Sequence, residues 1–153
     1  MIPNYDLIIV SDYGHGLISN KSADLICRRS KYLALNAQVN AANIGYHSMR
    51  NYKNLDCVII NKREMHHEMR DKNNKTTFLM KKLSVQQKIG NLVVTQGSEG
   101  AMMYTKKNNK FNFCKAFANN VVDKIGAGDA MLSIVAPCIK NGFDKELSLL
   151  IGS

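Results

Sequence analysis

The sequence predicts an α/β fold, in which helices flank a mostly parallel sheet that ends in an antiparallel hairpin. Four short, continuous apolar runs alternate with longer stretches of helical pattern. Runs of this kind are typical of strands that are buried on both faces, as in parallel sheets. A later stretch holds two strand-like runs joined by a polar turn, which is the pattern of a hairpin.

Four strands are expected in the first two thirds of the chain. They are the runs DLIIVS, YLALN, DCVIIN and NLVVTQ, at residues 6–11, 32–36, 56–61 and 91–96. Helices are expected between and beside them, with Ser19 or Asn20 as the first cap, at residues 21–30, 41–52, 62–70 and 76–88. This β-α-β-α order favours parallel strands.

The pattern changes after residue 100. The runs AMMYT and FNFCK, separated by the polar stretch KKNNK, predict the antiparallel hairpin. Two helices follow, at residues 126–141 and 145–151, and Pro137 is expected to kink the first by removing one backbone hydrogen bond. We find no internal repeat and no linker, so we expect one domain over residues 1–153.

Composition limits the classes of partner. The 153 residues are 45% hydrophobic and 22% charged, which suits one globular domain with a sizeable core. Lys and Arg number 21 against 12 Asp and Glu, so an anionic partner is favoured, such as a nucleotide or a phosphosugar. The basic residues form no stripe with interleaved aromatics, which argues against nucleic acid.

The expected location is the cytoplasm. The four cysteines lie far apart and include no C-x-x-C pair, so the sequence indicates neither a zinc site nor a disulfide framework. No leader opens the chain and no apolar run approaches the ~18 residues that a membrane span needs, so no membrane partner is expected.

The stretch DKIGAGD, residues 123–129, is the strongest candidate site. Glycines let a backbone approach a ligand closely, and a helix start offers unpaired N–H donors, so this turn suits an anion. We expect the N–H groups of Gly126, Ala127 and Gly128 to stabilise a transferring phosphoryl group. The carboxylate of Asp129 would accept the proton of the attacking hydroxyl. The alternative is that Asp129 only caps a helix after a tight turn.

Three further candidate sites follow predicted strands, where ligands bind in open α/β sheets. Thr95, Gly97 and Gly100 form a candidate nucleotide-binding turn, or only a glycine turn. The pair Asn61 and Glu64 would hold magnesium largely through its waters, or would only cap a helix.

The third of these sites follows the first predicted strand. Asp12, Gly14 and His15 either have a binding role or only turn the chain. The amides of Asn36, Gln38, Asn40 and Asn43 could cap turns or line a site.

Taken in this order, the motifs resemble the C-terminal half of a ribokinase-like carbohydrate kinase of the PfkB family. DKIGAGD is similar to that family's D-T-x-G-A-G-D signature, with Lys124 in place of threonine. N-x-x-E is matched at residues 61–64 and T-x-G-x-x-G at residues 95–100. SDYGHG is similar to the D-Y-x-K-G stretch of the family's heptose-phosphate kinases, with His15 in place of lysine. This resemblance implies that Asp12, Gly14 and His15 lie towards the phosphates or the substrate.

The resemblance implies a Rossmann-like, ribokinase-like sheet and ATP-dependent phosphotransfer to a hydroxyl of a sugar or sugar phosphate. It implies ATP, Mg²⁺ and a monovalent cation as cofactors, with Glu64, through water, and Asp123 as metal positions. Such kinases are about twice as long, and their N-terminal half, with its β lid and most sugar contacts, is not seen here. We therefore expect that missing half, or a second copy, as a partner. A nucleotide-binding remnant without an acceptor site is the alternative.

Overall fold

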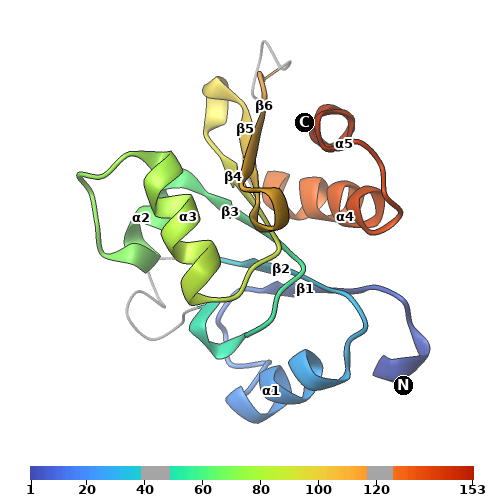
Figure 1. Ribbon diagram of the computed structural model, residues 1–153. Helices are drawn as coiled ribbons and strands as arrows, with labels where there is room; N and C mark the ends of the chain where they lie inside the picture. Colours follow the sequence, from blue (N-terminus) through green and yellow to red (C-terminus); the bar gives the residue numbers. More distant parts are fainter. Residues whose placement is uncertain (39–48, 117–125) are drawn as a thin grey trace.

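The computed structural model describes residues 1–38, 49–116 and 126–153. A six-stranded sheet lies at its centre, with helices on both faces (Figure 1). The strands lie side by side in chain order; the first four are parallel and the last two antiparallel. Their bounds are β1 (Ile8–Asp12), β2 (Leu33–Ala37), β3 (Cys57–Asn61), β4 (Asn91–Thr95), β5 (Ala101–Thr105) and β6 (Lys110–Cys114). The predicted fold class is therefore confirmed.

Each face of the sheet packs against its own group of helices. One face meets α1 (Asn20–Arg29), α2 (Lys62–Met69) and α3 (Thr76–Gln86), and the other meets α4 (Ala127–Lys140) and α5 (Lys145–Gly152). The middle strand β3 shows why both faces are apolar: Val58 and Ile60 belong to the first core cluster, and Cys57 and Ile59 to the second. Side chains alternate across a strand, so a continuous apolar run supplies both cores.

Local sequence signals set the helix ends. Ser19 caps α1 by accepting a hydrogen bond from the N–H of Ser22, as expected for one of the two predicted caps. Asp144 caps α5 by accepting from the first-turn N–H groups. Pro137 lies inside α4, which runs as one helix to Lys140, and the expected kink there remains a prediction.

One predicted helix needs correction. The helix expected at residues 41–52 falls mostly on residues 39–48, outside the described part of the chain. Its described end, Met49–Asn51, is a 3₁₀ turn instead of an α-helix, closed by the Tyr52 N–H on the Met49 carbonyl at 2.9 Å. Further 3₁₀ turns lie at Ile2–Asn4, Gly97–Glu99 and Lys106–Asn108. Within the described ranges, no helix is both long and apolar enough to cross a membrane.

Candidate active site

Asp129 lies in the first turn of α4, where four side chains donate hydrogen bonds to its carboxylate. Its Oδ1 accepts from Ser11 Oγ at 2.6 Å and from Asn36 Nδ2 at 2.8 Å. Its Oδ2 accepts from Tyr13 Oη at 2.5 Å and from Gln38 Nε2 at 3.4 Å. The start of α4 is thereby joined to the carboxyl ends of β1 and β2.

The register of the sheet explains this grouping. Ser11 of β1 pairs with Asn36 of β2, so the two side chains stand next to each other on the face that α4 covers. Tyr13 comes two residues after Ser11, and Gln38 comes two residues after Asn36. Because side chains alternate along an extended chain, residues two apart point to the same side. Four donors therefore converge on one carboxylate.

This environment changes the pKa values of two groups. Partial burial raises the pKa of Asp129, but the hydrogen bonds from Ser11, Tyr13 and Asn36 outweigh it and hold the pKa below its ordinary value of 3.8. The pKa of Tyr13 is raised, chiefly because its hydroxyl donates to the Asp129 carboxylate. At neutral pH the site therefore holds a carboxylate and a protonated phenol.

The glycine turn before α4, predicted as an anion site, begins at a residue in the left-handed conformation. Gly126 is the N-cap residue of α4, and its φ of +79° is a conformation that favours glycine. Within the described chain no side chain caps α4, and the N–H groups of a helix's first turn have no partner inside the helix. A Cβ on Gly128 would lie 3.2 Å from Asn36 Nδ2. A larger residue there would therefore press on the Asn36 amide that donates to Asp129.

Asn61 and Glu64 form a reciprocal capping box at the start of α2. Asn61 Oδ1 accepts from the Glu64 N–H at 2.7 Å, and Glu64 Oε2 accepts from the Asn61 N–H at 2.9 Å. Both residues therefore have the capping role that the sequence left open. A carboxylate and an amide oxygen at a strand end also remain a chemically suitable set for magnesium held through its waters.

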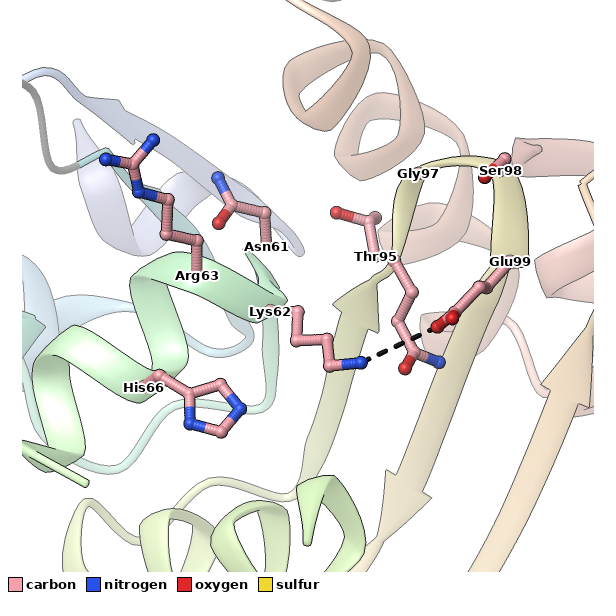
Figure 2. Close-up of a pocket in the computed structure, with 9 residues that line it drawn as sticks. Asn61, Lys62, Arg63, His66, Thr95, Gly97, Ser98 and Glu99 are labelled. Atoms are coloured by element: carbon pink, nitrogen blue, oxygen red, sulfur yellow. Dashed lines mark ion pairs between the residues drawn. The ribbon is translucent and has the colours of Figure 1, made fainter. Parts of the chain in front are cut away.

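A groove of about 440 Å³ opens between the start of α2 and the turn after β4. Figure 2 shows side chains from both walls facing it, with Asn61 and Lys62 on one side and Thr95 and Glu99 on the other. Asn61 and Thr95 are register partners at the ends of β3 and β4. The Lys62 ammonium spans the groove to the Glu99 carboxylate at 3.6 Å. Arg63 and His66 add basic character on the α2 side.

The two glycines of the predicted nucleotide turn differ. Gly97 lines the groove with a φ of +60°, and a Cβ there would meet no atom within 4 Å. Gly100 is buried with a φ of +99°, and a Cβ there would lie 2.1 Å from the Cys114 carbonyl oxygen. The close passage of β6 accounts for the glycine at position 100, while Gly97 is open to a ligand.

The turn after β1 divides its residues between the two faces. Asp12 is buried, with 5% of its surface exposed, and it accepts hydrogen bonds from Tyr52 Oη at 2.5 Å and from the Gly14 N–H at 3.0 Å. His15 is exposed, and its ring centre lies 6.4 Å from that of Tyr13. The carboxylate at position 12 thus points to the face opposite Asp129.

Sequence reasoning missed Ser11 and Tyr13 as partners of Asp129, and it left the roles of Asn36 and Gln38 open. The missed signal is the period of two, since positions 11 and 13 share a face that excludes position 12. Asp123, a predicted metal position, lies outside the described residues. Within the part that the structure describes, no three His, Cys, Asp or Glu residues gather as a metal cluster.

Residues 26–153 match the pfkB family of carbohydrate kinases. The chain belongs to this family. This pfkB-family chain is 26% identical over 145 residues to bifunctional protein HldE of Desulfatibacillum aliphaticivorans, a match that covers 92% of the chain and 29% of HldE. It therefore spans less than a third of that relative.

Solved structures give the same fold. Phosphofructokinase-2 from Escherichia coli, in complex with potassium, superposes with a TM-score of 0.76 at 12% identity, covering 95% of this chain and 48% of that one. Arabidopsis thaliana ribokinase, complexed with ribose and ATP, superposes with a TM-score of 0.74 at 17% identity, covering 99% and 48%. The pfkB-family chain thus has the ribokinase-like fold and spans about half of each structure.

Proposed function

We propose that this chain carries the phosphoryl-transfer site of an ATP-dependent kinase, whose acceptor is a hydroxyl of a sugar or sugar phosphate. The observation that carries the proposal is the position of Asp129, in the first turn of α4 beside a glycine turn that no side chain of the described residues caps. A carboxylate next to the N–H groups of a helix start would provide a proton acceptor and an anion site within one turn of helix.

The chemistry follows from these positions. The acceptor O–H gives its proton to Asp129 while its oxygen attacks the γ-phosphorus and the bond to the ADP oxygen breaks. The N–H groups of Ala127 and Gly128 face the negative charge that builds on the phosphoryl oxygens. Magnesium, bound with ATP near Asn61 and Glu64, would neutralise phosphate charge.

The basic groove is the proposed place for the nucleotide. Lys62, Arg63 and His66 line it beside Gly97. The groove lies at the carboxyl ends of the parallel strands, as Asp129 does. A triphosphate would compete with Glu99 for the Lys62 ammonium, 3.6 Å away. The ATP in the Arabidopsis ribokinase and the potassium in the phosphofructokinase-2 support ATP and a monovalent cation as ligands here. We place the protein in the cytoplasm, where ATP is present.

A second candidate function is nucleotide binding without catalysis. It is favoured by the four hydrogen bonds that occupy the Asp129 carboxylate and by its lowered pKa, both of which weaken a base. The chain also spans only about half of each of these solved structures. Further acceptor contacts would have to come from a part that corresponds to the other half.

Calorimetry with ATP and magnesium tests the shared part of both candidates. The chain should bind ATP, and Gly126→Ala should weaken binding at least about tenfold by straining the turn. Gly142→Ala is the matched control, because Gly142 also has a φ near +80° with nothing within 4 Å of a Cβ, but lies in the α4–α5 loop. No ATP binding at millimolar concentration, in a sample shown to be folded by circular dichroism, would reject the proposal.

A further inference from the structure

The carboxylate of Asp129 is fully engaged before any acceptor arrives. A carboxylate offers about four lone-pair positions. Each is matched by one donor, from Ser11 and Asn36 on Oδ1 and from Tyr13 and Gln38 on Oδ2. A general base must itself accept a hydrogen bond from the hydroxyl that it deprotonates. One of the four donors therefore has to leave when an acceptor binds.

Tyr13 is the strong donor that is best placed to leave. Ser11 lies within β1, and Asn36 lies within β2 with only 3% of its surface exposed. Tyr13 follows the end of β1 and is 42% exposed. Two glycines with φ of +69° and +84°, Gly14 and Gly16, follow it, so the backbone can turn there at low cost. Gln38 also follows its strand, but its amide is 3.4 Å from Oδ2, whereas Tyr13 Oη, at 2.5 Å, holds the hydrogen-bond position that an acceptor hydroxyl needs.

The Tyr13 hydroxyl also resembles an acceptor chemically. It is an O–H donor at 2.5 Å from Oδ2, which is the contact that a sugar hydroxyl would make with a base. Ser11 Oγ is the other hydroxyl on this carboxylate, at 2.6 Å from Oδ1, but it lies within β1. His15 is an exposed ring beside Tyr13, and Asp12 faces the opposite side of the sheet.

We propose that the hydroxyl of Tyr13 occupies the acceptor's place on Asp129, and that the sugar hydroxyl displaces it when the acceptor binds. This rests on the proposed function, since it assigns the acceptor position within that site. Tyr13 is then a residue that sets acceptor affinity: a ligand gains a hydrogen bond to Asp129 only after breaking one. Ligands without a hydroxyl that can reach Oδ2 leave Tyr13 in place.

The first test measures the contact in the 153-residue chain by carboxyl ¹³C NMR, with Asp129→Asn used to assign the signal. Tyr13→Phe removes only the hydroxyl, so the pKa of Asp129 should rise. Tyr5→Phe is the matched control, because Tyr5 is an exposed tyrosine outside the site, and it should leave this pKa unchanged. An unchanged Asp129 titration in Tyr13→Phe overturns the proposal.

The second test measures the displacement by calorimetry. The probes are ribose and fructose 6-phosphate, each with magnesium and a non-hydrolysable ATP analogue. Tyr13→Phe should bind at least one sugar about threefold to tenfold more tightly than the wild type, the range expected for one hydrogen bond that no longer has to be broken. Ser11→Ala also removes a donor from Asp129, but it should not tighten sugar binding.

The outcomes separate this proposal from the kinase assignment. Equal or weaker sugar affinity in Tyr13→Phe, or no sugar binding to either protein, overturns the displacement. A gain of the same size in Ser11→Ala also overturns it, because the effect would then be a general loosening of Asp129. Binding of the ATP analogue alone is a separate readout, and its loss in the wild type would reject the proposed function instead.

Discussion

The hydroxyl of Tyr52 donates a 2.5 Å hydrogen bond to the carboxylate of Asp12, 40 positions earlier in the chain. Tyr52 is fully buried and Asp12 is 5% exposed. Burial, followed by this hydrogen bond, raises the pKa of Tyr52 far above its usual range, so the phenol stays protonated. The bond fixes which way the end of β1 faces: with Asp12 turned inward here, Ser11 and Tyr13 are turned towards Asp129.

Tyr52→Phe should therefore lower the free energy of unfolding by about 1–3 kcal/mol, because the buried carboxylate loses a donor while the ring still fills its space. Urea denaturation measures the change. Tyr5→Phe, at an exposed tyrosine, should change it by less than about 0.5 kcal/mol. Equal stability of Tyr52→Phe and the wild type would show that the bond adds nothing.

Asp129→Asn tests the base. It keeps the size of the side chain but removes the group that accepts a proton, so sugar-dependent ADP release should fall about 100-fold or more with little change in ATP affinity. The assay uses a longer form of the protein that shows such release, because the 153-residue chain alone is expected to show none. Asp24→Asn is the control, since Asp24 is an exposed carboxylate that pairs with Arg28 on α1. Near-normal turnover in Asp129→Asn would remove this residue from the mechanism.

Low pH should reveal how much the charge of Asp129 contributes to the free energy of unfolding. The folded pKa of Asp129 lies below its ordinary value of 3.8, so its charge stabilises the fold above that pH, and this contribution is lost as the pH falls through the folded pKa. The stability advantage of the wild type over Asp129→Asn should be constant near neutral pH and shrink below about pH 4. Denaturation of both proteins at several pH values measures this difference. The contributions of other carboxylates with lowered pKa values, such as Asp71 and Asp144, cancel in it because both proteins contain them. An advantage that grows towards low pH would contradict the assigned sign.

Much of the fold could be predicted because the strands of the parallel part are apolar on both faces. The burial of Cys57, Val58, Ile59 and Ile60 is what a continuous run in a central strand predicts. The hairpin was predicted from two strand-like runs joined by a polar turn, and it closes through Asn109 in the left-handed conformation. The bounds of the described strands and of the other five helices agree to within about two residues, which is the usual ambiguity of element ends.

The candidate site could be predicted only where one segment contains it. Gly126 and Asp129 are close in sequence, so the turn and its acid were visible together. The four donors come from β1, β2 and the turns after them, and their meeting depends on the pairing of Ser11 with Asn36. That register joins two strands that α1 separates in the chain, so no pattern within either strand alone specifies it.

Glu64→Gln separates the two roles of the α2 start. Glutamine can also complete a capping box, so the free energy of unfolding should change by less than about 0.5 kcal/mol. A neutral side chain is a weaker partner for magnesium and its waters, so the magnesium dependence of ATP binding should shift to higher concentration. Asn61→Ala, in contrast, removes the cap and should cost about 1 kcal/mol.

Calorimetry over a magnesium series and urea denaturation provide the two readouts for Glu64→Gln. A large loss of stability with an unchanged magnesium dependence would mean that Glu64 serves only the cap.

The outer edge of β1 leads to a prediction about association. In the described part of the sheet β1 has one neighbour, β2, and its other edge carries no strand. Ile9 is 42% exposed on this strand, and Leu17, in the segment after it, is 94% exposed. Unpaired edges with exposed apolar side chains invite pairing with another chain, and the solved relatives are about twice as long.

We therefore expect the 153-residue chain to be marginally stable, to self-associate with rising concentration, and to show no sugar-dependent ADP release above slow ATP hydrolysis. Ile9→Lys should reduce association in sedimentation velocity, because a charge on an edge strand opposes pairing. Phe78→Lys adds the same charge at an exposed phenylalanine on α3 and should have less effect. A stable monomer with a cooperative thermal transition and sugar-dependent ADP release would contradict this, and would mean that the chain alone completes phosphotransfer to a sugar.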